Sequence, residues 1–219
     1  MTLSVHALTT VERLRIYNLG RDEIPPVQDL LLESLIEAIS RQVERHVGYH
    51  LEKRTTADET HSGGGQFLKV RNRPVITVTT VKENDSALAA ADYVWDREEF
   101  KERGLVYRES GWPAARVGAR GTLDFIPVDW RVAYPYKVTY DAGYVLPSNP
   151  GVSANPPTAT ISLEPDIELA CWRLLMATYQ HRDKEGVTSI SLEGVTLTFD
   201  RWPKDVKELL APYRILAVA

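Results

Sequence analysis

Residues 27–50 read VQDLLLESLIEAISRQVERHVGYH, and this stretch decides the fold. Its apolar residues recur every four positions, at Leu31, Leu35, Ile39, Val43 and Val47. Leu32 and Ile36 widen this stripe, and most of the charged residues lie outside it. The pattern predicts an amphipathic helix of about 20 residues with one face buried in a core.

Two histidines lie at the end of this helix. His46 and His50 stand four residues apart, the spacing of two metal ligands on one helical turn. Zinc metalloprotease helices carry a glutamate directly after the first histidine, whereas this chain has Val47 there. Gly48 after an amphipathic stripe is typical of a helix C-cap. We therefore interpret the pair as the exit of the helix, and a His-ligated metal-dependent enzyme remains the less favoured alternative.

Downstream of Gly48 the hydrophobic period changes from about four residues to about two. Stretches rich in β-branched and aromatic residues follow one another at 66–70, 75–81, 92–96, 104–107, 121–126 and 136–140. Their spacing predicts an antiparallel sheet or small sandwich over residues 51–145. The glycines at 63–65 are followed by neither the Lys nor the Ser/Thr of a phosphate-binding loop. They predict a flexible hairpin connection instead.

Helical patterns lie on both sides of this region. Residues 9–19 predict a short helix that Thr9 or Thr10 caps and that Gly20 closes. From Pro165 helical spacing returns, with acidic residues in the first turn and basic residues near the end, as the helix dipole favours.

Shorter elements are expected toward the C-terminus. Residues 187–199 predict two short strands or an extended loop turning at Glu193 and Gly194. A short helix is expected between Pro203 and Pro212, followed by a mostly apolar end. Trp202 precedes this helix and is a candidate both for a partner contact and for core packing.

The predicted fold class is α+β, a helical bundle with an inserted antiparallel β domain. Two N-terminal helices, one long central helix and a short C-terminal helix make the bundle, from residues 1–50 and 161–219. Each helix has one apolar face and no other obvious place to bury it, so the helices are expected to pack together. Residues 51–145 form the inserted domain, and the proline-rich stretch 146–160 is read as a linker.

Composition excludes several classes of function. With 219 residues, 43% of them hydrophobic, the chain can bury a sizeable core. A formal net charge of −4 argues against a protein that coats nucleic acid. The single cysteine, Cys171, allows neither an intrachain disulfide nor a cysteine-based zinc cluster, and it lies on an apolar helical stripe. Neither a signal pattern nor a membrane-spanning run is present, which predicts a soluble compartment.

Carboxylates are scattered or paired with Lys and Arg, and no constellation of residues predicts catalysis. The positive signals are a helical bundle, an inserted sheet and an apolar tail, which together indicate an assembly component. Several stretches, in order, resemble the head–tail adaptor (connector, head-completion) proteins of tailed bacteriophages and related gene-transfer particles. The stretches are LLLESLIEAISRQVERHVGYHLEKRT (30–55), LKVRNRPVITVTTV (68–81), ADYVWD (91–96), ESGWP (109–113), VTYDAGY (138–144) and WPKDVKELLAPYRI (202–215).

The resemblance implies a structural protein with no enzymatic activity and no cofactor. It implies a ring, dodecameric in that family, that lies below the portal protein and extends the DNA channel to the stopper or tail-completion protein. Double-stranded DNA is expected to pass without specific binding, and no membrane is involved. The expected location is the virion neck, after assembly in the host cytoplasm. The alternative within the same class is another neck or tail-completion protein.

Two sets of residues are candidates for contacts with other virion proteins. The C-terminal segment is expected to bind the portal through Trp202, Leu209, Tyr213, Arg214, Ile215 and Leu216. Apolar residues at a chain end are costly in a monomer and become buried on assembly. The second set is expected to face the channel or the protein below, and comprises Ser191, Glu193, Gly194 and Asp200.

Overall fold

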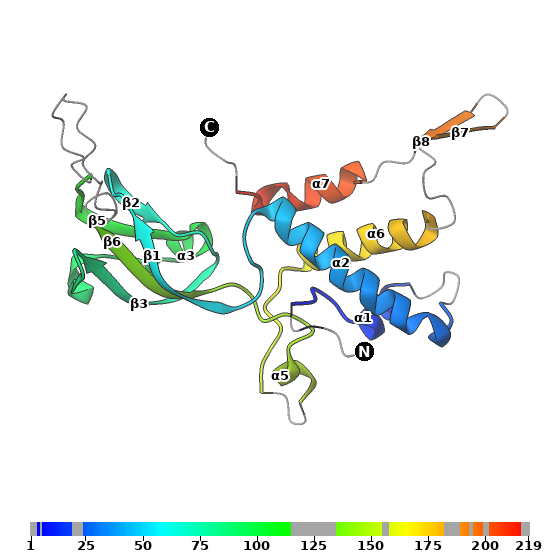
Figure 1. Cartoon of the computed structure of the whole chain (residues 1–219), viewed down its shortest axis with the longest axis horizontal. Helices are drawn as coiled ribbons and strands as arrows, with labels where there is room; N and C mark the ends of the chain where they lie inside the picture. Colours follow the sequence, from blue (N-terminus) through cyan, green and yellow to red (C-terminus); the bar gives the residue numbers. More distant parts are fainter. Residues whose placement is uncertain are drawn as a thin grey trace, which may run out of the picture. The chain divides into compact units, whose positions relative to one another are not determined.

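The structure is a computed structural model of the chain. It describes residues 4, 6–18, 24–114, 135–154, 158–181, 189–192, 195–198 and 202–215. The chain divides into two compact units (Figure 1). Unit 1 comprises Met1–Tyr49 and Val145–Ala219, and unit 2 comprises His50–Tyr144. The fold is α+β, as predicted, with antiparallel sheets.

Unit 1 is mainly helical. Its elements are α1 (Val11–Tyr17), the 3-10 turn η1 (Pro26–Gln28), α2 (Asp29–Val47), α5 (Pro150–Ser153), α6 (Pro165–His181), β7 (Ser189–Leu192), β8 (Val195–Thr198), α7 (Lys204–Leu210) and the 3-10 turn η4 (Ala211–Tyr213). Helix α2 contacts both α1 and α6, and α6 contacts α7. Figure 1 shows α2, α6 and α7 side by side.

Helix α1 begins where the sequence predicts and ends earlier. The Thr10 hydroxyl accepts a hydrogen bond from the backbone N–H of Arg13, which caps the first turn. The helix ends at Tyr17 with Asn18 as the C-cap residue. Gly20, the predicted closing residue, lies outside the described residues.

Helix α2 buries five of the seven residues of the predicted stripe. Its buried residues are Leu32, Ile36, Ile39, Ser40, Val43 and Val47, whereas Leu31 is 42% exposed and Leu35 is half-buried. A helix has 3.6 residues per turn, so a strict four-residue series rotates by about 40° at each step. The series that starts at Leu31 therefore reaches the core face only from Ile39 onward.

Unit 2 is mainly β-structure. Its elements are β1 (Arg54–His61), β2 (Gly65–Lys69), β3 (Val75–Glu83), β4 (Ser86–Ala87), η2 (Ala90–Asp92), α3 (Glu98–Arg103), β5 (Leu105–Trp112) and β6 (Tyr136–Ala142). One sheet has the strand order β1-β6-β3-β4, and β2 pairs with β5 in a second sheet. Both sheets contribute to one hydrophobic core, made of Leu68, Val70, Val75, Val78, Val81, Tyr93, Val106, Trp112, Tyr136, Val138, Tyr140 and Ala142.

Several sequence expectations for this unit were wrong. Strand β1 was not predicted, because its sequence RTTADETH is polar and its side chains are exposed or half-buried. Residues 92–96, predicted as a strand, make only an isolated bridge between Val94 and Tyr107. Helix α3 lies between predicted strands, and residues 121–126 lie outside the described residues.

The glycines at 63–65 do not form a hairpin connection. Strands β1 and β2, on either side of them, belong to different sheets. Gly63 has φ +73°, and an added Cβ would lie 2.5 Å from the Pro113 carbonyl oxygen and 2.7 Å from a ring carbon of Tyr136. The chain therefore turns between the sheets through a closely packed position that only glycine fits.

Part of the proline-rich stretch 146–160 packs within unit 1. Leu146 is buried, and the Ser148 hydroxyl donates to the Ala7 carbonyl oxygen at 2.6 Å. The Asn149 side chain caps the short helix α5 by accepting from the Gly151 N–H at 2.9 Å. These contacts attach this part of the stretch to the N-terminal residues of the same unit.

Candidate assembly interfaces

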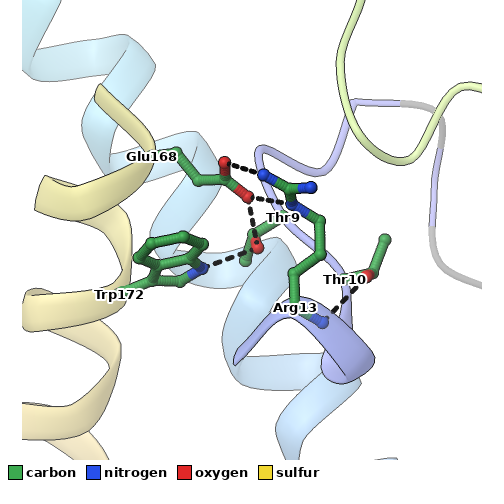
Figure 2. Close-up of polar contacts among 5 residues, drawn as sticks. All are labelled: Thr9, Thr10, Arg13, Glu168 and Trp172. Atoms are coloured by element: carbon green, nitrogen blue, oxygen red, sulfur yellow. Dashed lines mark hydrogen bonds and ion pairs between the residues drawn. The ribbon is translucent and has the colours of Figure 1, made fainter. Parts of the chain in front are cut away.

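A buried carboxylate fixes α1 on α6 (Figure 2). Arg13 Nε and Nη2 donate to the two oxygens of Glu168, each at 2.6 Å, and the Thr9 hydroxyl donates to Glu168 Oε1 at 2.9 Å. The indole N–H of Trp172 donates to Thr9 Oγ1 at 2.8 Å. The hydrogen bond to Glu168 raises the pKa of Arg13. Because both carboxylate oxygens are engaged, this cluster is a structural clamp rather than an acid–base site.

Cys171, next to this clamp on α6, is fully buried. Burial raises the pKa of its thiol to about 12, with the negative charge of Glu168 as a further cause. A thiol with such a pKa is protonated at neutral pH and is not a nucleophile. Cys171 therefore serves as a small core residue, as its position on an apolar stripe predicts.

The histidine pair is divided by the end of α2. Gly48 takes the left-handed conformation at φ +94° and donates its N–H to the Glu44 carbonyl oxygen, so the helix does not continue to His50. The His46 ring instead stacks on the indole of Trp202, with ring centroids 4.7 Å apart. Burial lowers the pKa of His46, and the nearby charges of Arg214 and Lys207 lower it further.

Metal-ligand geometry is not found in the described part of the chain, where no group of three or more His, Cys, Asp or Glu side chains could hold an ion. Likewise, none of the described helices is both long and apolar enough to span a membrane.

Two of the predicted portal-binding residues, Trp202 and Ile215, contact the C-terminal end of α2. The backbone N–H of Ile215 donates to the Val47 carbonyl oxygen at 2.8 Å. Val206 and Leu210 anchor α7 in the core and are fully buried. The predicted residues Trp202, Leu209, Tyr213 and Ile215 are half-buried, Arg214 is exposed, and Leu216 lies outside the described residues.

Of the second predicted set, Ser191 lies in strand β7 of a β-hairpin. Strands β7 and β8 are antiparallel, with Ser191 opposite Thr196 and Leu192 opposite Val195. Two short strands or an extended loop were the expectations for residues 187–199, and the structure has the two strands. Glu193, Gly194 and Asp200 themselves lie outside the described residues.

Sequence reasoning missed an exposed apolar group in unit 1. Its members are Ile16 (66% exposed), Val27 (86%), Leu30 (62%) and Leu31 (42%). The three- and four-residue spacing of the last three places them on one side of η1 and the start of α2. That spacing was visible in the sequence, but Leu31 was assigned to the core stripe.

Comparison with known proteins places the chain in a family. A family model described as "Head completion protein" matches residues 7–216. Curated protein sequences give no match.

The fold is similar to that of chains in solved gene transfer agent (GTA) particles, at 16 to 19% sequence identity. These are "Neck of native GTA particle computed with C12 symmetry" (TM-score 0.51, 16% identity), "Virion of native gene transfer agent (GTA) particle" (0.53, 17%) and "Neck of empty GTA particle computed with C6 symmetry" (0.54, 19%). Each match covers 100% of this chain and 94 or 95% of the other. The chain thus belongs to the head completion protein family, and it is a structural virion protein and not an enzyme.

Proposed function

We propose that this chain is the head–tail adaptor of a tailed phage or phage-like particle. Copies assemble in the host cytoplasm into a ring below the portal, which extends the DNA channel and connects the head to the stopper or tail. The family match over residues 7–216 carries the proposal. The fold shared with chains from GTA necks supports a position in the neck, and the C12 symmetry of one such neck supports a ring of twelve.

In this proposal the C-terminal segment, residues 202–219, binds the portal. Arg214 is exposed beside the half-buried Tyr213 and Ile215. Aromatic and arginine side chains of this kind are the residues that most often dominate the binding energy of an interface. The segment also stays attached to unit 1 through the bond from Ile215 to Val47, so a bound portal would be coupled directly to the end of α2.

The β7–β8 hairpin faces the channel or the next protein below. In the sequence Glu193 stands between the two strands and Asp200 follows the second, and in this proposal both contribute negative charge there. Together with the net charge of −4, such groups repel DNA phosphates. DNA then passes without specific binding, as a channel requires.

Imaging of particles that contain the tagged full chain tests this function. We expect a ring of density between portal and tail that fits the two units, with residues 202–219 against the portal and the hairpin facing away from it. Purified portal protein should also bind the isolated chain. A ring lower in the neck would indicate a tail-completion protein, and absence of the chain from particles would refute the function altogether.

A further inference from the structure

The side of α2 that faces away from the core carries an unusual set of residues. It is formed by Val27 of η1 and by residues of α2, and we call it the outer α2 face: Val27, Leu30, Leu31, Ser34, Ala38, Arg41 and Arg45. All of these are exposed. At 3.6 residues per turn they lie opposite the buried stripe that contains Leu32, Ile36 and Val43.

The first half of the outer α2 face has no charged side chain. A helix surface in contact with water normally carries charged and polar residues, whereas a helix that is apolar on all sides is buried. Leu30 and Leu31 are 62% and 42% exposed here. Ser34 is the polar member, and its hydroxyl donates to the Leu30 carbonyl oxygen at 3.0 Å. Because this hydroxyl already has an acceptor, an apolar partner that covers Ser34 would not bury an unpaired hydrogen-bond donor.

The second half of the outer α2 face is basic. The Arg41 side chain is 67% exposed and lies 3.9 Å from Glu37, which makes a weak surface pair, and Arg45 is exposed. The face is therefore not complementary to itself. Two copies packed antiparallel would place leucines opposite arginines, and two packed parallel would place arginines opposite arginines.

A face that cannot pair with its own copy needs a different surface on its partner. Contacts between two different surfaces of identical subunits are heterologous, and they build rings when the rotation closes. The chain offers acidic groups that could meet Arg41 and Arg45, because Glu164 and Asp166 are exposed at the start of α6. In an isologous pairing of this face, by contrast, the arginines would meet leucines or one another.

We propose that the outer α2 face is the surface through which one copy of this chain binds the next copy around the ring. The inference rests on the proposed function, and it names the residues that make the subunit contact. Leu30 and Leu31 are the apolar centre of that contact, and Arg41 and Arg45 select the register through charge.

Photo-crosslinking in assembled particles tests the proposal. The full chain carries benzoylphenylalanine in place of Leu31, and irradiated particles are digested and analysed by mass spectrometry. We expect crosslinks from residue 31 to a second copy of the chain. Crosslinks from residue 31 only to another virion protein, or none while the chain is present, would overturn the proposal and leave the neck function intact.

A double substitution, L30D/L31D, gives a second readout. We expect particles to contain roughly tenfold fewer copies of the variant, because interface centres carry most of the binding energy. I76D is the matched control, since Ile76 is 40% exposed but lies in unit 2. Both variants should melt within a few degrees of the parent, and normal incorporation of a folded L30D/L31D chain would contradict the proposal.

If the chain is missing from particles, the proposed function fails. Analytical ultracentrifugation of the purified chain then tests whether copies bind one another through the outer α2 face. Concentration-dependent association that L30D/L31D weakens and I76D does not would support the surface on its own. A purified chain that stays monomeric, or whose association L30D/L31D leaves unchanged, would overturn it.

Discussion

At the scale of single residues, the clamp around Glu168 shows how a charge can be buried at little cost. The carboxylate is 4% exposed, yet it accepts two hydrogen bonds from Arg13 and one from Thr9. Burying an ion is unfavourable unless a counter-ion and hydrogen bonds compensate, and here both do. The clamp holds helix α1 on α6. This contact matters because a helix of seven residues is too short to be stable alone.

We expect Glu168→Gln to lower the free energy of unfolding by about 1–3 kcal/mol, since the amide cannot replace the charged, two-pronged bond to Arg13. Urea denaturation monitored by tryptophan fluorescence measures this. Glu208→Gln is the control, because that carboxylate is 68% exposed and makes only a surface pair with Lys204. It should stay within about 0.5 kcal/mol of the parent. Equal losses of unfolding free energy in the two variants would show that the clamp stabilises the fold no more than a surface ion pair does.

At the scale of elements, connections decide which strands can pair. Strands β1 and β2 are joined by three residues and still lie in different sheets, because the turn at Gly63 approaches the backbone at Trp112 and Pro113. The Gly64 N–H donates to the Trp112 carbonyl oxygen at 2.7 Å, which holds this turn at the end of β5. A side chain at Gly63 would separate these segments.

Two glycines of the same loop provide a matched test at this scale. Gly63→Ala should destabilise the protein by about 2 kcal/mol or more, since its Cβ would overlap Pro113 and Tyr136 in a left-handed backbone conformation. Gly65→Ala should change the free energy of unfolding by less than about 1 kcal/mol, because nothing lies within 4 Å of its added Cβ. Thermal and urea unfolding of both variants give the comparison, and similar losses would contradict the assignment of Gly63 to a packed turn.

At the scale of the whole molecule, the chain leaves its helical unit after Tyr49 and returns to it at Val145. Unit 1 is thus completed only when residues distant in sequence meet, as when Thr9 meets Glu168 and Val47 meets Ile215. The C-terminal segment therefore has two parts. Helix α7 belongs to the core through Val206 and Leu210, whereas Arg214 is exposed and Ile215 is half-buried.

This division predicts different results for two truncations. Removal of 214–219 should cost about 1 kcal/mol or less of stability, since it leaves the buried Val206 and Leu210 in place, but should prevent DNA-filled heads from joining tails. Removal of 203–219 should cost several kcal/mol, because it deletes the fully buried Val206 and Leu210. Circular dichroism melts separate the two effects on folding. Normal tail attachment by the 214–219 truncation would refute portal docking through these residues.

The sequence by itself determined the α+β class, the long helix capped by Gly48 and the helix from Pro165, and it limited residues 187–199 to two short strands or an extended loop. These features depend on local periodicity, capping and turn chemistry, which act between residues close in the chain. Only the tertiary structure decided the polar strand β1, the two-sheet arrangement and the exposure of Leu31 on α2. Each of these depends on a partner far along the chain: β6 pairs with β1, and α6 covers α2. The spacing of the apolar residues on the outer α2 face is visible in the sequence, but their exposure is a property of the folded chain.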